Sequence, residues 1–375
     1  MQILSQPFSH IYVEKEILDH PRTIRILDYF LKGWEKEYIQ EEKSTGKDKS
    51  TEKDGNSSRG TDKKNCQKTV GKQNRQIIEI SHYKDVFCRK KQDVFLQNQA
   101  PMLILAKRRE NFLYSGSPVC QSFDERYFYY TSCVMNCLYD CEYCYLKGMY
   151  PSGNLVIFVN IEDTFSEVEK VLQEHEVYLC ISYDSDLMAV ENLTGFVGAW
   201  SEFAAEHKNL KIECRTKCGR TDLWKTLHPG SNMIFAFTIS PERVIRNYEH
   251  RTSSFFDRLS CITEAMKMGF PVRLCFDPMI YLPEWKREYE QMLREVKKRI
   301  PMERLYDVSV GSFRISQDYL KKMRHVLPDS AVVQFPFENE RGVYHYPKVL
   351  MEEMEGFLKE ELKKELPEEK IFLWN

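Results

Sequence analysis

Three cysteines, Cys137, Cys141 and Cys144, lie within the short stretch CLYDCEYCYLKG. The chain has 12 cysteines and its first residues, MQILSQPFSHIYVEK, do not resemble a signal peptide, so we expect reduced thiols or metal ligands rather than disulfides. A zinc site usually takes four protein ligands, for which Cys133 is a candidate, and a redox dithiol would leave Cys137 unexplained. Three thiolates can bind three irons of a [4Fe–4S] cube and leave the fourth iron open. We therefore predict a [4Fe–4S] cluster, with zinc as the alternative.

The elements that must position these thiols begin at about residue 127. From there, apolar runs of strand length alternate with amphipathic stretches of helical spacing, which predicts parallel βαβ units. The fold class that we expect is α/β, an open or partial parallel β/α barrel. Barrels of this type carry their chemistry at the C-terminal ends of the strands, and the three cysteines follow the first of the runs. The apolar runs are YFYYTS, LVIFVN, VYLCISY, LKIECRT, MIFAFTIS, VRLCFDPMI and LYDVSVGSF.

Composition divides the chain into three regions: an N-terminal α/β region at 1–125, the partial barrel at 126–330, and a C-terminal hairpin and helix at 331–375. Within the first region, 41–76 is rich in Lys, Ser, Gly and Asp with almost nothing apolar, so we predict a disordered insertion. The formal net charge of −2 excludes a globally basic polyanion binder. Without a long apolar run, we expect a soluble, cytoplasmic protein with no membrane partner.

The cysteine spacing, with an aromatic residue before the last cysteine, resembles that of the radical S-adenosylmethionine superfamily. Within it the chain resembles the spore photoproduct lyase family, through CEYCYL, SDLMAVENLT, RTKCGRTDLWKTL, FAFTISPERVIRNYEHRTSSFFDRL and PMIYLPEW. The resemblance implies a [4Fe–4S] cluster whose open iron binds S-adenosyl-L-methionine. It also implies reductive cleavage to a 5′-deoxyadenosyl radical, fed by a one-electron donor such as ferredoxin or flavodoxin.

The resemblance further implies the residues that bind the cofactor. Ser185 and Asp186 match a Ser-Asp step that helps to hold S-adenosylmethionine, and Lys217 matches a lysine that pairs with its carboxylate. Thr238 matches a hydroxyl near the ribose, and Tyr143 holds the position of a ring near the adenine. Each also has an ordinary structural interpretation, as a turn, a strand residue or a core aromatic residue.

The resemblance assigns hydrogen transfer to a second group of residues. Tyr143 and Tyr145 match a pair that returns a hydrogen atom to regenerate S-adenosylmethionine. The family's hydrogen-donating cysteine lies three residues before the aspartate of the Ser-Asp step, and Tyr183 holds that position here. Cys180 is the nearest thiol, but three residues along a strand is the opposite face, so we favour Tyr183 as the donor.

A last group of residues is expected to contact DNA. The stretch FENERGVYHYP stands where the family has a longer basic hairpin that enters the duplex, and Arg341, Tyr344 and Tyr346 keep its charge and its stacking rings. Arg314 is a further candidate contact. The resemblance thus implies a DNA-repair lyase that reverses the spore photoproduct, 5-thyminyl-5,6-dihydrothymine. The alternative is a radical enzyme of the same family acting on a different nucleic-acid, peptide or small-molecule substrate.

Overall fold

A computed structural model describes residues 8, 10–30, 76–116, 121–230 and 232–374. Its larger sheet has eight strands in the order β18-β14-β13-β11-β10-β9-β5-β4. All neighbouring pairs are parallel except β4 with β5, which confirms the predicted open β/α barrel. The strands are β4 (Tyr114–Ser115), β5 (Phe128–Tyr130), β9 (Val177–Cys180), β10 (Leu210–Thr216), β11 (Met233–Thr238), β13 (Val272–Met279), β14 (Asp307–Ser312) and β18 (Ile371–Leu373).

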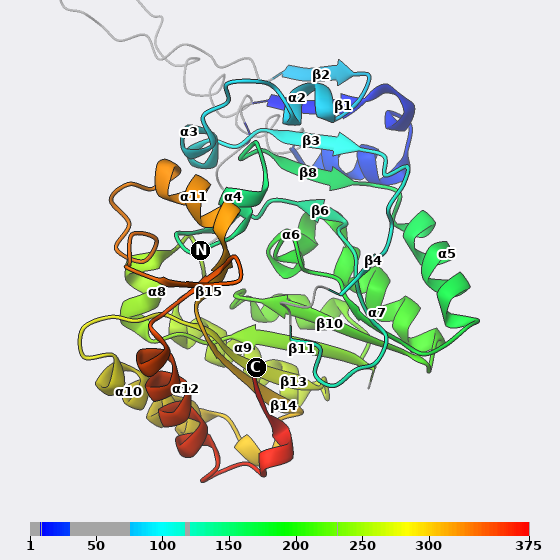
Figure 1. Ribbon diagram of the computed structural model, residues 1–375. Coiled ribbons are helices and arrows are strands. Elements are labelled where there is room, and N and C mark those ends of the chain that lie inside the picture. Colours follow the sequence, from blue (N-terminus) through cyan, green and yellow to red (C-terminus); the bar gives the residue numbers. More distant parts are fainter. Residues whose placement is uncertain (1–7, 9, 31–75, 117–120, 231, 375) are drawn as a thin grey trace, which may run out of the picture.

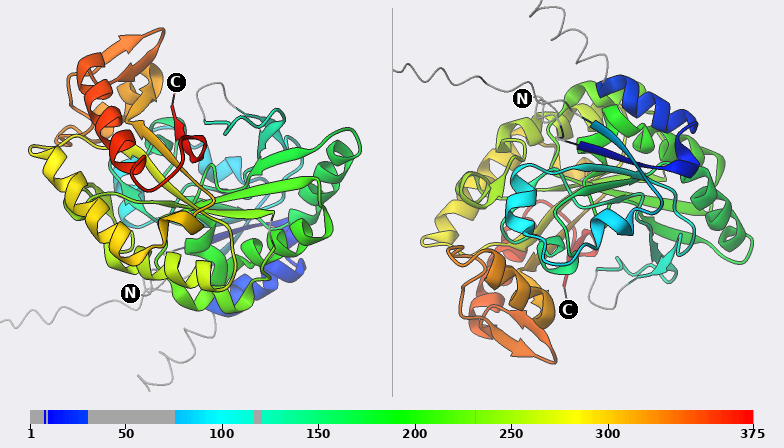
Figure 2. Two further views of the ribbon diagram at one scale, coloured as in Figure 1. Left: turned by 90° about the horizontal axis from the view of Figure 1, so that it is seen from below. Right: turned by 90° about the horizontal axis from the view of Figure 1, so that it is seen from above.

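Helices between the strands cover the outer face of this curved sheet (Figures 1 and 2). The outward side chains of the strands, such as Leu179, Ile212 and Phe235, are fully buried and belong to the same core as Trp200 and Ile262 of the helices. This burial supplies the main hydrophobic stabilisation of the barrel. The helices are α5 (Ile161–Leu172), α6 (Leu187–Thr194), α7 (Phe196–Glu206), α8 (Glu242–Tyr248), α9 (Phe255–Lys267) and α10 (Trp285–Arg299).

The inner face of the same strands is polar as well as apolar. Tyr178 and Arg273 both bind the carboxylate of Glu213, and Arg273 also pairs with Asp307. All four side chains are buried. Alternation along each strand therefore separates an apolar outer face from an inner face that carries a network of ion pairs.

A second sheet of five strands, in the order β2-β1-β3-β8-β6, lies above the barrel in Figure 1. The apolar run LVIFVN, which was expected in the barrel, is β8 of this sheet. Since all four residues of β8 are buried, its apolar pattern suits either sheet. The strands are β1 (His10–Glu14), β2 (Gln76–Ile80), β3 (Leu103–Ala106), β6 (Val134–Met135) and β8 (Leu155–Phe158).

The smaller sheet thus takes strands from both sides of the sequence-based boundary at residue 125, so that boundary does not separate the two sheets. The predicted disordered insertion at 41–76 lies outside the described residues, apart from Gln76, which begins β2. Among the helices that the structure describes, none is long and apolar enough to cross a membrane.

The C-terminal part has its own three-stranded antiparallel sheet of β15 (Arg314–Ser316), β17 (Val343–His345) and β16 (Glu338–Glu340). Arg341 and Gly342 form the two-residue turn of the β16–β17 hairpin, and both have positive φ, as such turns require. Two helices complete this part, α11 (Gln317–Val326) and α12 (Lys348–Leu362). Met354, Leu358 and Leu362 of α12 are buried, so this face of the helix packs against the core.

Candidate functional site

The three cysteines lie on one loop between β6 and the short helix α4 (Leu146–Met149). Cys141 is buried in β7 (Asp140–Cys141), while Cys137 and Cys144 are half-buried, and none of the three is in a disulfide. Burial raises the pKa of Cys137 and of Cys141, and the charge of nearby Cys144 raises both further. The three thiols are therefore close enough in space to act on one another.

Cys133, the candidate fourth ligand, has a different environment. Its side chain is buried in the hydrophobic core, where burial raises its pKa to about 11, and the groups acting on it are Arg108, Trp200 and Thr131. In the described part of the chain, no group of three or more His, Cys, Asp or Glu is arranged to hold a metal ion. A four-iron cube does not require that arrangement, because each thiolate binds its own iron. The cysteine loop therefore fits three ligands of a cluster, with Cys133 apart from them.

A buried carboxylate anchors this loop to the barrel. β12 (Glu249–His250) pairs with β7, with Glu249 opposite Cys141. The Glu249 side chain accepts hydrogen bonds from the Tyr143 phenol and from Ser240 Oγ at 2.8 Å, and it forms an ion pair with Arg258. Tyr143, Glu249 and Arg258 are all buried. We name Tyr143, Ser240, Glu249 and Arg258 the anchor network.

Asp186 fastens the loop after β9 to the end of β10. Its carboxylate caps α6 by accepting from the Ala189 amide at 3.1 Å, and it also accepts from Thr216 Oγ1 at 2.9 Å and from the Lys217 amide at 2.7 Å. The Lys217 ammonium lies 5.6 Å from the centre of the Tyr143 ring. Asp186, Lys217 and the cysteine loop therefore meet at the C-terminal ends of the strands, and the geometry gives Asp186 a positioning role.

Two buried polar atoms beside Asp186 have no hydrogen-bond partner among the described residues, namely Ser185 Oγ and Asp184 Oδ1. Buried polar atoms are normally paired, so an unpartnered hydroxyl points to a ligand that the protein binds there. Thr238, at the end of β11, is also buried, and its carbonyl accepts a hydrogen bond from Arg258 at 3.1 Å. Ser185, Thr238 and Lys217 thus lie on neighbouring loops or strand ends that can hold a polar cofactor.

Two of the predicted hydrogen-transfer residues, Tyr145 and Tyr183, belong to a row of rings, whereas Tyr143 belongs to the anchor network. The Tyr145 phenol donates a hydrogen bond to the Tyr183 carbonyl, and the two rings are 5.9 Å apart. Tyr183 stacks on Tyr130 at 4.5 Å, and Tyr130 stacks on Tyr114 at 4.9 Å. Of these rings, Tyr130 and Tyr114 were not identified from the sequence.

Cys180 is the last residue of β9, and its sulfur lies 3.9 Å from Glu213 Oε1 on the inner face of the barrel. Because the strand ends there, alternation does not determine where Tyr183 points relative to Cys180, contrary to the sequence argument. Cys180 faces the barrel interior without any displacement of the strand. The choice between the two residues as hydrogen donor stays a prediction.

The residues expected to contact DNA do not share one surface. Arg341 is exposed at the hairpin tip, and Tyr344 is half-buried with the Arg324 guanidinium 5.8 Å from its ring. Tyr346 is a core residue instead: it is 1% exposed, and its hydroxyl accepts a hydrogen bond from the Tyr281 amide at 3.0 Å. Its ring is therefore unavailable for stacking on a base, which corrects the sequence-based assignment.

Arg314 also differs from the expectation. Its guanidinium lies 4.1 Å from the centre of the Trp374 ring and 3.9 Å from the Glu355 carboxylate. These contacts hold it within the protein, so Arg341 and Tyr344 are the stronger candidates for nucleic acid.

Sequence reasoning missed Glu249 and Arg258 of the anchor network and the inner-face residue Arg215. A signal for the first two was present, because both lie in the string NYEHRTSSFFDRL, which was assigned to the family resemblance without a role. Arg215 and Glu213 alternate with apolar residues in LKIECRT, a pattern that marks the polar face of a strand.

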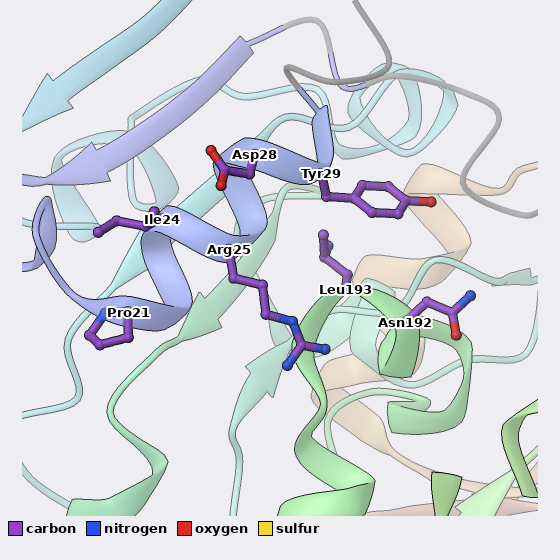
Figure 3. Close-up of a pocket in the computed structure, with 7 residues that line it drawn as sticks. All are labelled: Pro21, Ile24, Arg25, Asp28, Tyr29, Asn192 and Leu193. Carbon is purple, nitrogen blue, oxygen red and sulfur yellow. The ribbon is translucent and has the colours of Figure 1, made fainter. Parts of the chain in front are cut away.

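A surface pocket lies between the helical residues 21–30 and α6 (Figure 3). Its lining is Pro21, Ile24, Arg25, Asp28, Tyr29, Asn192 and Leu193, and it includes none of the predicted site residues. It is distinct from the site at the strand ends.

Comparisons with known proteins identify relatives of this chain. A family model described as spore photoproduct lyase matches residues 127–374. The spore photoproduct lyase of Clostridium acetobutylicum is 25% identical over 240 residues, which are 60% of this chain and 70% of that enzyme. The Bacillus subtilis enzyme is 24% identical over 178 residues, which are 46% of this chain and about half, 52%, of its own length.

Solved structures show the same fold. A spore photoproduct lyase variant with bound AdoMet and dinucleoside spore photoproduct superimposes with a TM-score of 0.75 at 17% identity, covering 98% of both chains. A spore photoproduct lyase complexed with the dinucleoside spore photoproduct also gives 0.75, at 16% identity over 99% of both chains. The match over residues 127–374 includes the cysteine loop, Asp186, Lys217 and the anchor network. The chain therefore belongs to the spore photoproduct lyase family of radical S-adenosylmethionine enzymes.

Proposed function

We propose that this protein is a DNA-repair lyase that reverses the spore photoproduct, 5-thyminyl-5,6-dihydrothymine. The observation that carries the proposal is the meeting of the cysteine loop, Lys217 and the unpartnered Ser185 hydroxyl at the strand ends of a barrel of this family. Relatives of the same fold have been solved with AdoMet and with the dinucleoside spore photoproduct, which supports extending both ligands to this chain.

In this proposal Cys137, Cys141 and Cys144 hold a [4Fe–4S] cluster. When bound, the cluster and S-adenosylmethionine supply a radical that abstracts a hydrogen atom from the dihydrothymine ring, with electrons from a donor such as ferredoxin or flavodoxin. Lys217 offers a compact positive charge to the carboxylate of the cofactor, and Ser185 offers a hydroxyl to its polar end. Reducing conditions without oxygen are required, because solvent-accessible iron–sulfur clusters and radicals react with oxygen.

Hydrogen bonds within the protein preorganise this site for its ligands. Asp186 fixes the loop that carries Ser185 by capping α6, and it fixes the backbone of Lys217 through the amide hydrogen bond. The anchor network fixes the Tyr143 ring, which belongs to the cysteine loop, close to Lys217. Such support reduces the conformational freedom that binding would otherwise remove.

In this proposal the hairpin tip and the row of tyrosines interact with the DNA substrate. Arg341, exposed at the turn, supplies a positive charge for a phosphate, and Tyr344 supplies a partly exposed ring. The rings of Tyr145 and Tyr183 lie 5.9 Å apart, so two phenols stand close together as candidates for passing a hydrogen atom between the cofactor and the lesion.

The proposal is tested with anaerobically reconstituted protein, S-adenosylmethionine and a reductant, acting in the dark on an oligonucleotide that contains one spore photoproduct. We expect two adjacent thymines to be restored, as measured by chromatography and mass spectrometry of the digested strand. A Cys141→Ala variant provides the control without a functional cluster. Cleavage of S-adenosylmethionine without any restored thymine would contradict the proposed substrate.

A further inference from the structure

The inner-face network consists of the ion-paired side chains Glu213, Arg273 and Asp307 together with Arg215 and Asp277. Among these five side chains, Arg215 is the one with appreciable solvent exposure. It lies near the C-terminal end of β10, where Nη1 donates to Asp277 Oδ2 at 2.8 Å and Nε lies 3.4 Å from Glu213 Oε1. The Arg215 side chain is 30% exposed, whereas those of Glu213 and Asp277 are 4% and 9% exposed. Its guanidinium therefore stands at the boundary between the buried network and the open interior of the barrel.

Both carboxylates that hold Arg215 are fixed by further contacts. Asp277 Oδ1 accepts a hydrogen bond from Ser309 Oγ at 2.7 Å, while Glu213 accepts from Tyr178 at 2.7 Å and pairs with Arg273. Because both carboxylate partners are fixed, the barrel strands determine the orientation of the Arg215 guanidinium plane. Among the described residues, none accepts a hydrogen bond from Arg215 Nη2, so this nitrogen keeps N–H donors available for a ligand.

The charge around Arg215 restricts what these donors can bind. Two carboxylates bracket one guanidinium, so the positive charge is compensated locally, and the attraction for a phosphate is correspondingly reduced. A neutral acceptor, such as a carbonyl oxygen, needs only oriented N–H groups and no net charge. Each pyrimidine ring of a thymine lesion carries two such carbonyls.

We propose that Arg215 binds a ring carbonyl of the lesion and so orients its two linked thymine rings in the barrel. This proposal rests on the proposed function. The sulfur of Cys180 contacts the same oxygen of Glu213 that lies next to Arg215. A ring held by Arg215 is therefore placed near the Cys180 thiol, and Tyr130 of the row of tyrosines lies opposite Cys180 on the neighbouring strand. Arg215 is thus a specificity residue for the base and not for the backbone of the DNA.

The test measures equilibrium binding of two probes to the reconstituted protein, the dinucleoside spore photoproduct and the corresponding dinucleotide with its phosphate. In Arg215→Lys, which keeps a positive charge but loses the fork, we expect both probes to bind about tenfold or more weakly. The matched control is Arg243→Lys, because Arg243 has a side chain 35% exposed and a single carboxylate partner, Glu288, outside the inner-face network. The control variant is expected to bind both probes as the unmutated protein does.

Two further readouts separate the possible failures. Thermal unfolding and substrate-free formation of 5′-deoxyadenosine are expected to be unchanged in Arg215→Lys, which shows that the barrel and the cofactor site are intact. Normal binding of both probes by Arg215→Lys, or a loss confined to the probe with the phosphate, overturns the carbonyl contact. If the unmutated protein binds neither probe, the proposed function itself fails.

Discussion

The four cysteines around residue 140 differ in what surrounds each thiol. Cys137, Cys141 and Cys144 act on one another electrostatically, whereas Cys133 is buried in the apolar core, where Arg108 and Arg22 lower the pKa that burial raises. A buried thiol of the second kind behaves as a small apolar side chain. The surroundings of Cys133, rather than its position in the sequence, therefore distinguish it as a structural cysteine from the three candidate ligands.

This difference gives the first prediction. Replacing Cys137, Cys141 or Cys144 singly by Ala is expected to abolish the cluster after anaerobic reconstitution, because the remaining two thiolates cannot hold the cube. Cys133→Ala is expected to keep the full iron content. The measurement is iron and sulfide per chain together with the visible absorption. Equal loss in Cys133→Ala would indicate a four-cysteine site and leave no open iron for the cofactor.

Lys217 gives the second prediction. Lys217→Ala is expected to weaken binding of S-adenosylmethionine by about 1.5–3 kcal/mol, the usual effect of removing a charged hydrogen-bond partner. Lys211→Ala is the control, because that lysine lies near the start of β10, which ends just before Lys217, and it pairs with Glu125. Isothermal titration of the reconstituted variants measures the difference. An unchanged affinity would show that the Lys217 ammonium only packs against Tyr143.

The hydrogen donor gives the third prediction. Tyr183→Phe keeps the ring that stacks on Tyr130 and the carbonyl that binds Tyr145, but it removes the phenolic O–H, so we expect side products in place of restored thymine. Cys180→Ala is the comparison, since its thiol also faces the interior. Chromatography of the digested oligonucleotide separates thymine from trapped adducts. Clean repair by Tyr183→Phe together with failure of Cys180→Ala would assign the role to the thiol.

At the scale of elements, the cysteine loop is held by a two-residue strand pair that would be weak by itself. β7 and β12 share only two residue pairs, and the buried anchor network lies beside them. A buried ion pair is not necessarily stabilising, but breaking one leaves an uncompensated charge. The anchor network therefore determines the position of the loop more than the strand pair does.

The fourth prediction follows from this. Glu249→Gln leaves Arg258 buried without its charged partner, so we expect the free energy of unfolding to fall by about 3–5 kcal/mol. Iron occupancy is also expected to fall. Tyr143→Phe removes one hydrogen bond and should cost only about 0.5–1.5 kcal/mol. Glu167→Gln is the control, because its pair with Lys170 is exposed.

Chemical denaturation and iron analysis measure these effects. The free energy of unfolding for Glu167→Gln is expected to lie within about 0.5 kcal/mol of the unmutated value. A Glu249→Gln variant with normal stability and a full cluster would show that the strand pair alone holds the loop.

The strands and helices of the barrel could be predicted because their apolar periods are regular. β8 could not be assigned, since a strand buried on both faces carries no sign of which sheet it joins. Tyr346 was misassigned because a short sequence of aromatic residues does not show which ring turns inward. The cysteine spacing was informative because it is local, whereas Glu249 and Arg215 reach their partners only through the fold.

At the scale of the whole molecule, the cysteine loop connects two sheets. The chain leaves the large sheet at β5, contributes β6 to the smaller sheet, forms the loop, and enters the smaller sheet again at β8. The site is therefore bounded by the smaller sheet on one side and by the barrel strand ends on the other (Figure 1). Sheets packed in this way give a loop with both ends fixed, which suits a cluster that must stay close to Lys217.

The proposal links three parts of this molecule in one reaction, namely the cluster loop, the cofactor residues and the barrel interior. The most direct test is transfer of an isotope label from the substrate. The spore photoproduct is prepared with deuterium on the dihydrothymine ring and incubated anaerobically with the reduced protein and S-adenosylmethionine. We predict deuterium in the 5′-deoxyadenosine or the recovered S-adenosylmethionine, together with restored thymine. Formation of 5′-deoxyadenosine that carries no deuterium, with the lesion unchanged, would contradict the account.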